Sequence, residues 1–336
     1  MKAISMKPGL LKGISLKSTA VKVSAAEKTS EGGKARVKKM KNVNHAAYYF
    51  VLPFVIVFAI FSIYPVVRTF YLSFMDYKGY GEPTFNGLAN YARVLHDKFF
   101  WRALKNTLKI WGVNIILQLG IAFLLTVIFS DIKYKMAGLP VLRAVYYLPN
   151  LISTVSVAFL FKTLLDWQHG TFNQILMASG LMKTPVNWMG TVVTAPYVVS
   201  VLGAWMWFGN SFIVLMAGVQ GIPKDYFEAA AIDGSGRWNT FLRITIPLLR
   251  PILLYVFVTS LIGGLQLFDL PFMMQGAAPG TMGEPSGSLQ TVVMYLYKFG
   301  FETHQVGYAS AIAYVLFAII LIFSLIQFHF LGKEDN

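Results

Sequence analysis

Residues 228–234 read Glu-Ala-Ala-Ala-Ile-Asp-Gly, and residues 244–247 read Ile-Thr-Ile-Pro. This polar stretch lies between two apolar runs that are long enough to cross a bilayer. Pro223 suits the first turn of a helix, and the acidic Asp225 and Glu228 stand early, where they complement the helix dipole. Glycine ends helices, so Gly234 marks a stop. The sequence therefore predicts a short helix over 223–232 that joins two membrane-spanning segments.

The composition of the chain is that of a membrane protein. Of its 336 residues, 56% are hydrophobic and 13% are charged, whereas a soluble domain carries roughly 25% charged residues. The mean hydropathy is +0.56. There is no cysteine, which excludes disulfides, thiolate metal sites and cysteine nucleophiles.

Six segments have the approximately 20 apolar residues that a bilayer span needs. They are residues 48–67, 104–129, 145–165, 196–219, 247–267 and 308–330. Backbone groups in lipid must be satisfied within the segment, so these spans are helices, and no period-2 pattern indicates a barrel. We expect an all-α membrane protein with six transmembrane helices.

The N-terminal residues 1–45 form a basic tail. They hold eleven Lys and Arg residues against two Glu residues, a net charge of +9, within a total of +14 for the chain. Ser, Gly and Thr are frequent there, which is typical of disorder. The basic part is too long for a signal peptide. Nucleic-acid binding is an alternative that we reject in favour of a cytoplasmic anchor in contact with anionic lipid.

The loops follow the positive-inside rule with one exception. Three basic residues stand in each of the loops 131–143 and 220–246, whereas the loops 166–195 and 271–307 hold one Lys each. The exception is the loop 68–103, which has five basic residues and is followed by Lys105. The tail carries more positive charge than this loop, so both termini are predicted to be cytoplasmic.

These patterns divide the chain into four parts. Residues 1–45 are the disordered cytoplasmic tail, and residues 46–103 hold the first span and an outer loop. Residues 104–331 form the main transmembrane domain, with the polar helix within 222–236, and residues 332–336 are a cytoplasmic end.

The outer loops also carry structural signals. Gly and Pro turns predict that the loop 68–103 is ordered. Phe99, Phe100 and Trp101 indicate an interfacial aromatic belt at the start of the second span. Residues 289–299 are expected to form an amphipathic helix that lies on the membrane face.

The polar stretch resembles a known signature. Its order is Glu-Ala-Ala, two residues, Asp-Gly, nine residues, then Ile-x-Ile-Pro, which is similar to the signature loop of permease subunits in binding-protein-dependent ABC importers. Ile246 replaces a more usual Leu, and Gly236 is also less usual. In that family the loop is the coupling helix, which docks on the ATPase subunit. The resemblance assigns this contact to Phe227, Glu228, Ala229, Ala230, Asp233 and Gly234.

Further segments resemble the carbohydrate branch of this family, the maltose-type and multiple-sugar-type permeases. They are Arg-Ala-Val-Tyr-Tyr-Leu-Pro at 143–149, the stretch 268–280 that begins Phe-Asp-Leu-Pro, and Gly-Tyr-Ala-Ser-Ala at 307–311. The resemblance is strong over 104–330 and looser over 48–103.

The resemblance implies a type I ABC importer fold in a bacterial inner membrane and a sugar substrate, with an oligosaccharide preferred. It also implies a second homologous permease subunit, an ATPase dimer and an extracytoplasmic solute-binding protein as partners. This chain has no Gly-x-x-x-x-Gly-Lys-Ser/Thr loop. We therefore expect no cofactor in it, with ATP and Mg²⁺ on the partner ATPase.

A sugar site in a membrane needs hydrogen-bonding groups and aromatic faces that are turned away from lipid. The fourth and fifth spans offer such groups, and the family's binding positions fall among them. The candidate substrate-binding residues are Gly203, Trp207, Asn210, Ser260, Gly264, Gln266 and Leu267. Gly264 and Leu267 are not polar, unlike several of the corresponding family positions, so Gln266 is the substitute polar contact.

Packing roles compete with these assignments. Asn210 is also able to bond a neighbouring helix, and the glycines to permit close helix packing. Trp205 and Trp207 are two residues apart, so only one of them can face a given cavity. Asn114 and Gln118 share a helix face and are predicted to serve packing.

Two other functions are alternatives to sugar import. A permease of the same family for a polyol or glycerol phosphate is the first, and a phosphate would favour Arg or Lys within the fourth or fifth span, where none stands. An intramembrane enzyme is the second, and it would need paired carboxylates or a His-rich cluster within the spans. Lys162 and Asp166, four residues apart, are expected to form a surface ion pair instead.

Overall fold

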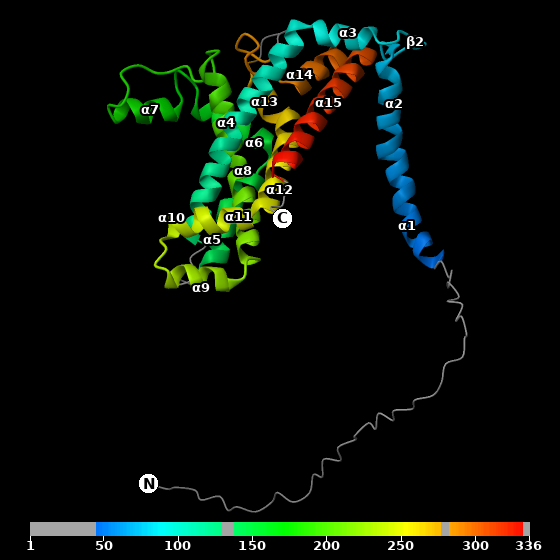
Figure 1. The fold of residues 1–336 in the computed structure, drawn as a ribbon. Coiled ribbons are helices and arrows are strands. Elements are labelled where there is room, and N and C mark those ends of the chain that lie inside the picture. The colour runs from blue at the N-terminus through cyan, green and yellow to red at the C-terminus, as the bar shows by residue number, and fades with distance from the viewer. Residues whose placement is uncertain (1–44, 130–137, 277–281, 332–336) are drawn as a thin grey trace, which may run out of the picture. The chain divides into compact units, whose positions relative to one another are not determined.

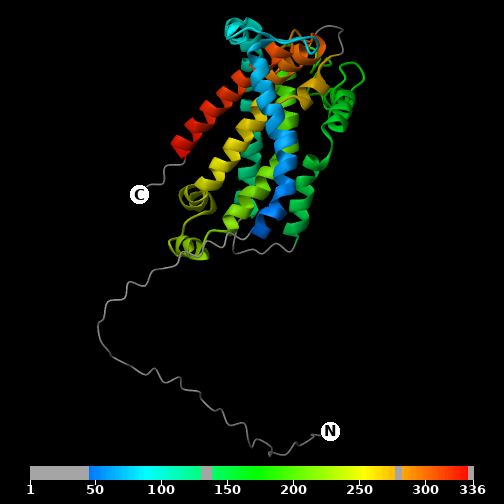
Figure 2. The ribbon, with the colours of Figure 1, turned by 90° about the vertical axis from the view of Figure 1, so that its right-hand side faces the viewer.

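The computed structural model describes residues 45–129, 138–276 and 282–331. These residues are helical almost throughout, with one antiparallel sheet of two short strands. The chain divides into two units, residues 1–53 and residues 54–336. The second unit holds the helix bundle that is drawn in Figure 1 and, turned by 90°, in Figure 2.

The elements follow one another in three described stretches. The first holds α1 (His45–Phe58), η1 (Ala59–Ile63), α2 (Tyr64–Ser73), β1 (Met75–Asp76), β2 (Thr84–Phe85), α3 (Ala89–His96) and α4 (Lys98–Phe129). The second holds α5 (Leu139–Leu151), α6 (Thr154–Leu164), α7 (Thr171–Ala178), α8 (Thr194–Gln220), α9 (Lys224–Ile232), α10 (Arg237–Thr240), η2 (Phe241–Thr245), α11 (Ile246–Leu248), α12 (Arg250–Leu265) and α13 (Asp269–Met274). The third holds α14 (Val292–Tyr297), η3 (Lys298–Glu302) and α15 (Val306–Leu331).

Among the described residues, four helices are long and apolar enough to cross a membrane, or up to six spans if each of two bent helix pairs counts as one. The four are Tyr48–Ser73, Lys98–Phe129, Thr194–Gln220 and Val306–Phe330. The prediction of a single helix over 145–165 is wrong, because that segment is sharply bent. The helix predicted over 247–267 is found as α12 over Arg250–Leu265, with a sharp bend at its start.

The third predicted span breaks between α5 and α6, whose axes differ by 85°. Pro149 lies in the last turn of α5, where its missing N–H weakens the helix. Ser153 then adopts an extended conformation, and its hydroxyl accepts a hydrogen bond from Ser156 N at 3.2 Å, which caps α6. A helix stop signal followed at once by a start signal explains the bend.

The fifth predicted span breaks in the same way. The helix pair Arg237–Leu248 and Arg250–Leu265 is bent by 74°. Leu249 between them has a ψ of 1°, outside the helical range, and Pro251 occupies the first turn of α12. Proline is suited to begin a helix and unsuited to continue one.

The core of the bundle forms where α8 packs along α4, with α5 against the other side of α8. Buried side chains fill this contact, among them Ile110 on α4 and Phe212 and Leu215 on α8. At Gly209 the backbones of α8 and α5 meet, since a Cβ added there would lie 1.9 Å from the carbonyl oxygen of Tyr146. The helix α12 packs against α4, α8 and α15.

We call the end of the bundle that carries α3 and α14 the α3 end, and the opposite end, with α9 and α10, the α9 end (Figure 1). The loop 68–103 is ordered at the α3 end, as predicted, and forms β1, β2 and α3. The aromatic belt was predicted incorrectly for Phe100, which is 0% exposed. Only its neighbours Phe99 and Trp101 face outward.

The prediction of a helix within 289–299 is confirmed, and one side of this helix packs into the core. The helix α14 begins at Val292, and both Val292 and Met294 are fully buried. Thr291 fixes its start, because the hydroxyl accepts from Met294 N at 3.3 Å and donates to Leu267 O at 2.7 Å. This segment is therefore part of the core.

The predicted ion pair between Lys162 and Asp166 does not form. Lys162 Nζ donates to the carbonyl oxygen of Gln275, 3.0 Å away, which ties α6 to the end of α13. The Asp166 carboxylate accepts from the backbone N–H groups of Gln168 and His169 at 3.1 and 2.7 Å. Both side chains thus bond to backbone groups and not to each other.

Asp97 joins several elements at the α3 end. Its carboxylate accepts hydrogen bonds from the hydroxyls of Tyr295 and Tyr308, the latter at 2.8 Å. Burial raises the pKa of Asp97, but these two hydroxyls and the backbone N–H groups of Phe99 and Phe100 outweigh it and hold the pKa below its ordinary value. The loop that precedes α4 is thereby fastened to α14 and α15.

We expect Asp97→Asn to destabilise the α3 end by about 1–2 kcal/mol, since the hydrogen bonds lose their charged acceptor. Because the pKa of Asp97 is lower in the folded than in the unfolded protein, this stability is present above the unfolded pKa of about 3.9 and is lost as the pH falls through the folded pKa. Thermal unfolding of the detergent-solubilised protein should show a gap between wild type and variant at pH 7 that shrinks below about pH 4. The exposed Glu82 provides the control, because Glu82→Gln should leave the unfolding temperature unchanged. An equal gap at pH 7 and at pH 3 would contradict this role.

Candidate functional site

Residues Lys224–Ile232, which include most of the polar stretch between the fourth and fifth predicted spans, form α9. The predicted helix over 223–232 is therefore confirmed. Pro223 is its N-cap and not part of its first turn. At the other end Gly234 has a φ of +70°, which a residue with a Cβ rarely adopts. Gly234 N donates to Ala231 O at 3.2 Å and Ser235 N to Ala230 O at 2.9 Å. This is the Schellman arrangement, and it stops α9 sharply.

The six residues assigned to the ATPase contact divide between two faces of α9. Ala230 is 6% exposed and faces the bundle, and Phe227 packs on the apolar cluster at the α9 end. Phe227 and Ala230 therefore lie on the side of α9 that packs on the bundle. The other four, Glu228, Ala229, Asp233 and Gly234, are exposed.

The end of α8 before α9 is tied to α5. Gln220 is the last residue of α8, and its amide oxygen accepts from Arg143 Nη2 at 2.6 Å and from Nη1 at 3.1 Å. A guanidinium at a helix C-terminus also complements the helix dipole. A displacement of α9 therefore acts on α8 and α5 together.

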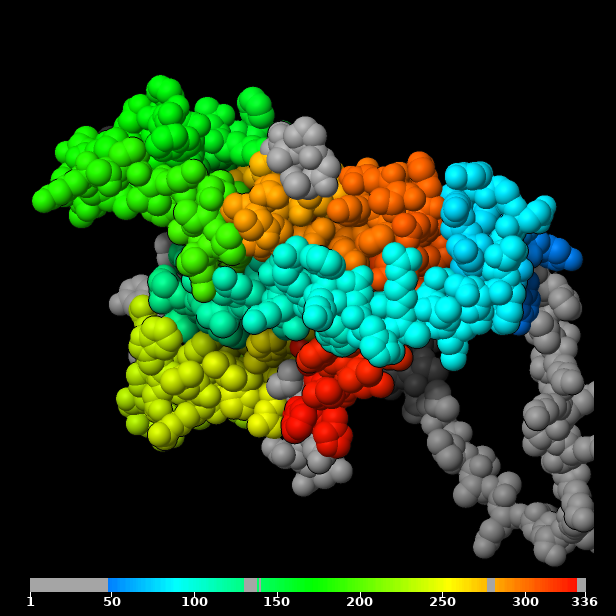
Figure 3. All heavy atoms as spheres, turned by 90° about the horizontal axis from the view of Figure 1, so that it is seen from above, coloured from blue at the N-terminus to red at the C-terminus, as the bar shows by residue number. Residues whose placement is uncertain are grey.

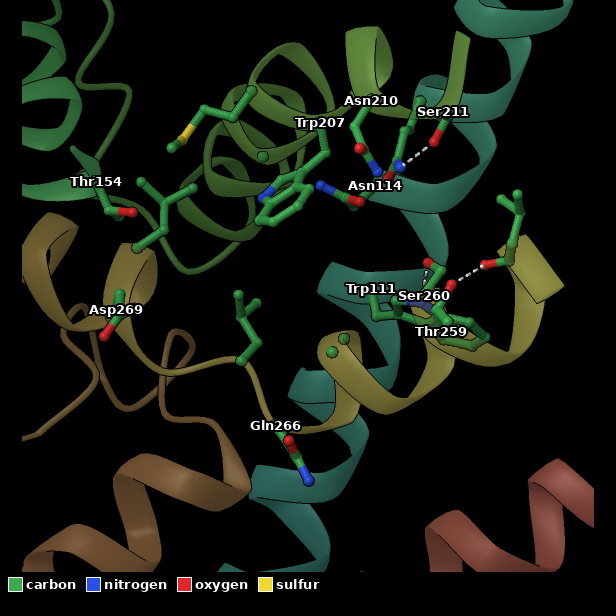
Figure 4. A pocket seen from close by; sticks show the side chains of 18 of the residues that line it. Trp111, Asn114, Thr154, Trp207, Asn210, Ser211, Thr259, Ser260, Gln266 and Asp269 are labelled. Carbon is green, nitrogen blue, oxygen red and sulfur yellow. Dashed lines mark hydrogen bonds between the residues drawn. The ribbon is translucent and has the colours of Figure 1, made fainter. Parts of the chain in front are cut away.

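A cavity of about 410 Å³ lies between α4, α6, α8 and α12. The structure brings all seven candidate substrate-binding residues to its wall: Gly203, Trp207, Asn210, Ser260, Gly264, Gln266 and Leu267. Figure 4 shows Trp207 and Asn210 on one side of the cavity, and Trp111 with Ser260 on another. Candidate residues up to 64 positions apart in sequence thus line one space.

The polar side chains of the wall differ in how far they are already engaged. Gln118 Nε2 donates to Ser211 Oγ at 2.6 Å and Asn114 Nδ2 to Ser200 O at 3.3 Å, so the predicted packing roles of Gln118 and Asn114 are confirmed. Asn210 lines the cavity without a hydrogen-bond partner among the described residues. Its amide is therefore available to a solute.

Glycine is required at two of the candidate positions because side chains of other wall residues pack against the backbone there. A Cβ added at Gly264 would lie 1.9 Å from Cδ1 of Trp111, and one added at Gly203 would lie 2.3 Å from Nδ2 of Asn114. The indole of Trp111 lies against α12 for this reason and donates from Nε1 to Ser260 Oγ at 3.1 Å. These glycines shape the wall and have no side chain to offer a ligand.

Trp205 and Trp207 separate as expected. Trp205 packs on Phe161, with 5.6 Å between ring centroids, while Trp207 lines the cavity and is 49% exposed. Their two-residue spacing on α8 turns them to different sides.

Several further residues line the cavity that were not predicted as site residues; they include Trp111, Thr154, Tyr255 and Thr259. Trp111 stands three and seven residues before Asn114 and Gln118, so a helix-face argument would have found it. Thr154 is the first residue of α6, and its position follows only from the bend between α5 and α6.

The cavity wall is nearly free of charge. Among the described residues that line it, Asp269 is the one ionisable acid or base other than Tyr255. No group of three or more acidic or histidine residues suited to a metal occurs in residues 45–129, 138–276 and 282–331. Two indoles, amides and hydroxyls thus set the chemistry of the cavity, and such groups suit a polar, uncharged solute.

Comparison with known proteins supplies the family. A family model described as "Binding-protein-dependent transport system inner membrane component" matches residues 118–332. The arabinooligosaccharides transport system permease protein AraP of Bacillus subtilis (strain 168) is 33% identical over 290 residues, which cover 86% of this chain and 89% of that protein. The lactose transport system permease protein LacF of Rhizobium radiobacter is 32% identical over 298 residues, with coverage of 88% and 96%.

A solved structure shares the fold. It is the crystal structure of a bacterial alginate ABC transporter in complex with an alginate pentasaccharide-bound periplasmic protein, and it matches with a TM-score of 0.71 and 25% identity over 85% of this chain and 93% of that one. The chain therefore belongs to the inner membrane components of binding-protein-dependent transport systems, the permease part of an ABC transporter and not its ATPase.

Proposed function

We propose that this chain is one of two permease subunits of a bacterial importer for a neutral carbohydrate, with an oligosaccharide preferred. The observation that carries the proposal is the cavity, whose wall combines the indoles of Trp111 and Trp207 with amides and hydroxyls and holds no Lys or Arg among the described residues. Two relatives, permease proteins of an arabinooligosaccharides transport system and of a lactose transport system, support the same substrate class.

The cavity suits a sugar in two ways. An indole offers a flat apolar surface to the C–H face of a sugar ring, and Trp207 presents such a surface. The amide of Asn210 and the hydroxyls of Thr154 and Thr259 offer hydrogen bonds to the ring hydroxyls. Trp207 and Asn210 are therefore the contacts that we expect to matter most. Gln266 and Leu267 extend this surface toward α13.

The topology that we propose counts each bent pair as one span, which makes six transmembrane helices. The α9 end then faces the cytoplasm, because the basic loop 220–246 and Arg143 belong to it and the basic tail 1–45 prefers the same side. Both termini are cytoplasmic in this arrangement, and the α3 end faces outward.

The partners follow from the family and from this topology. A second permease subunit completes the translocation path, as in a type I ABC importer. Two ATPase subunits hold ATP and Mg²⁺ and receive α9 through its exposed residues, and an extracytoplasmic binding protein delivers the sugar at the α3 end. The transport then proceeds by alternating access, in which ATP-driven closure of the ATPases pushes α9 and shifts the balance between two states of the bundle.

The alternatives fit less well. A glycerol phosphate would need a cation in the cavity, and the described wall offers none. An intramembrane enzyme would need paired acids or a histidine cluster in the cavity, and its wall carries the single carboxylate of Asp269.

The cavity is tested with Trp207→Ala and Asn210→Ala in the reconstituted importer. We expect each variant to raise the KM for sugar uptake by about tenfold, equivalent to 1.4 kcal/mol, because a stacking surface or a hydrogen bond to the sugar is lost. Phe159→Ala removes an aromatic ring that is 76% exposed on α6 outside the cavity, and it should leave the KM unchanged. Unaltered uptake of every transported sugar by both cavity variants would refute this site.

A further inference from the structure

The first twelve residues of α4 carry a row of four cations. Lys98, Arg102, Lys105 and Lys109 are spaced by four, three and four residues, so they lie on one face of the helix. All four side chains are exposed. We call them the α4 basic stripe. Figure 3 looks down on the α3 end, and this part of α4, cyan to teal, is uncovered there.

The stripe has no acidic partner within the described part of the chain. Arg102 lies 5.2 Å from the Phe99 ring centroid, and Lys109 Nζ lies 4.5 Å from that of Tyr197. The one ion pair within 4.0 Å in residues 45–129, 138–276 and 282–331 joins His169 and Asp166. Four positive charges on one helix face therefore have no acidic partner in the described part of the chain.

The depth of the stripe decides which partner it suits. Residues 110–129 of α4 hold no charge, and at 1.5 Å per residue they fill the approximately 30 Å of hydrocarbon. Lys105 then stands about 6 Å beyond the hydrocarbon, Arg102 about 11 Å and Lys98 about 17 Å. With residues 110–129 centred in the bilayer, a tilt of about 40° leaves Lys98 about 10 Å beyond the hydrocarbon.

The headgroup layer is only about 5–8 Å thick on each side. Lipid phosphates can therefore reach Lys109 and Lys105, but the upper half of the stripe stands above them. A macromolecule with carboxylates on its surface can meet all of the upper cations at once. The positive-inside tendency also disfavours such a cluster on the outer side, which indicates that the cluster serves a function.

We infer that the α4 basic stripe is a docking surface for an acidic patch on the extracytoplasmic solute-binding protein. This inference rests on the proposed function, in which the α3 end faces outward. Exposed charges that complement a partner act mainly on the association rate, which they raise at low salt and lose as salt screens them. The stripe therefore steers the loaded binding protein to the permease.

The test uses the complete importer in nanodiscs of neutral phosphatidylcholine, with the solute-binding protein of the same transport system. We expect Lys98→Gln/Lys105→Gln to slow association of the sugar-loaded binding protein by about tenfold at 50 mM salt and to flatten its dependence on salt. ATP hydrolysis at saturating binding protein should stay unchanged. Arg102 is left in place because its guanidinium lies against Gly287.

The control variant Lys78→Gln/Lys183→Gln also removes two exposed lysines but spares the stripe, so it should associate at the wild-type rate. Equal association of all three proteins would overturn the inference. So would a defect of the stripe variant that appears only when anionic phosphatidylglycerol is present, since the stripe would then bind lipid. If the wild-type importer associates with no binding protein at all, the proposed function itself fails, which is a distinguishable result.

Discussion

Glu228→Lys is expected to abolish ATP-driven sugar uptake while the permease stays in the membrane at its normal amount. Glu228 is exposed on α9, so its replacement leaves the packing of the bundle intact. The proposed ATPase contact, however, changes from negative to positive at its centre. Loss of a central interface side chain of this kind weakens the binding free energy by about 2 kcal/mol or more. This change corresponds to an approximately thirtyfold loss of affinity for the ATPase.

Two measurements check this expectation. Copurification of the ATPase subunits with the variant reports assembly, and uptake by reconstituted vesicles reports coupling. Asp76→Lys is the matched control, because it makes the same charge change on an exposed residue of β1 at the α3 end. Uptake and ATPase recovery at the wild-type level in Glu228→Lys would refute the role of α9.

The two faces of α9 permit a second, steric version of the same experiment. Ala229 is exposed, so Ala229→Trp adds bulk toward the proposed ATPase cleft with little effect on the bundle. Deletion of residues 227–230 removes the cleft contact together with the inward anchors Phe227 and Ala230. Both changes should stop uptake, but only the deletion should also lower the stability of the permease.

The position of α9 and several residues of the cavity wall could be predicted from the sequence, because the sequence signals for them are local. Gly234 is needed for a left-handed backbone conformation, and a helix that ends there follows from short-range rules. Trp207 and Asn210 stand three residues apart on one helix, so helical spacing alone brings them to one wall. Ser260 joins them only through the fold, and the family resemblance supplied that link.

The bends could not be predicted from hydropathy, which measures the length of an apolar run and not its direction. Pro149 and Pro251 were visible in the sequence, yet proline also occurs within continuous membrane helices, where neighbouring groups satisfy the freed carbonyl. The burial of Phe100 was missed for a related reason. An aromatic residue at a span end suits either the interface or the core, and only the packing of α3 and α14 decides between them.

The helix α8 connects the two sites. Asn210 lines the cavity, and Gln220, ten residues later, ends the helix just before α9. Ten residues of helix span about 15 Å. Arg143 holds the same end of α8 to α5, and α5 leads through its bend to Thr154 on the opposite wall. A push on α9 can therefore move two walls of the cavity at once.

Movement of both walls depends on the contact between α5 and α8. We therefore expect a large loss of stability and of uptake for Gly209→Ala, which lies at this contact. The added Cβ would lie 1.9 Å from the carbonyl oxygen of Tyr146 and 2.6 Å from its carbonyl carbon. Both are backbone atoms, so no side-chain rotation relieves the collision and the helices must separate. Overpacking of this kind costs about 1–3 kcal/mol, and small residues are what allow membrane helices to pack closely.

We expect the unfolding temperature of the purified permease to fall by about 5 °C in Gly209→Ala, with a matching loss of uptake. Gly120→Ala on α4 is the control, because its added Cβ meets nothing within 4 Å. Both changes gain the same helix propensity of about 1 kcal/mol, so the difference between the two variants isolates the collision. If the two variants unfold at the same temperature, α5 does not approach α8 closely at Gly209, and the proposed path from α9 through α5 to the cavity loses its basis.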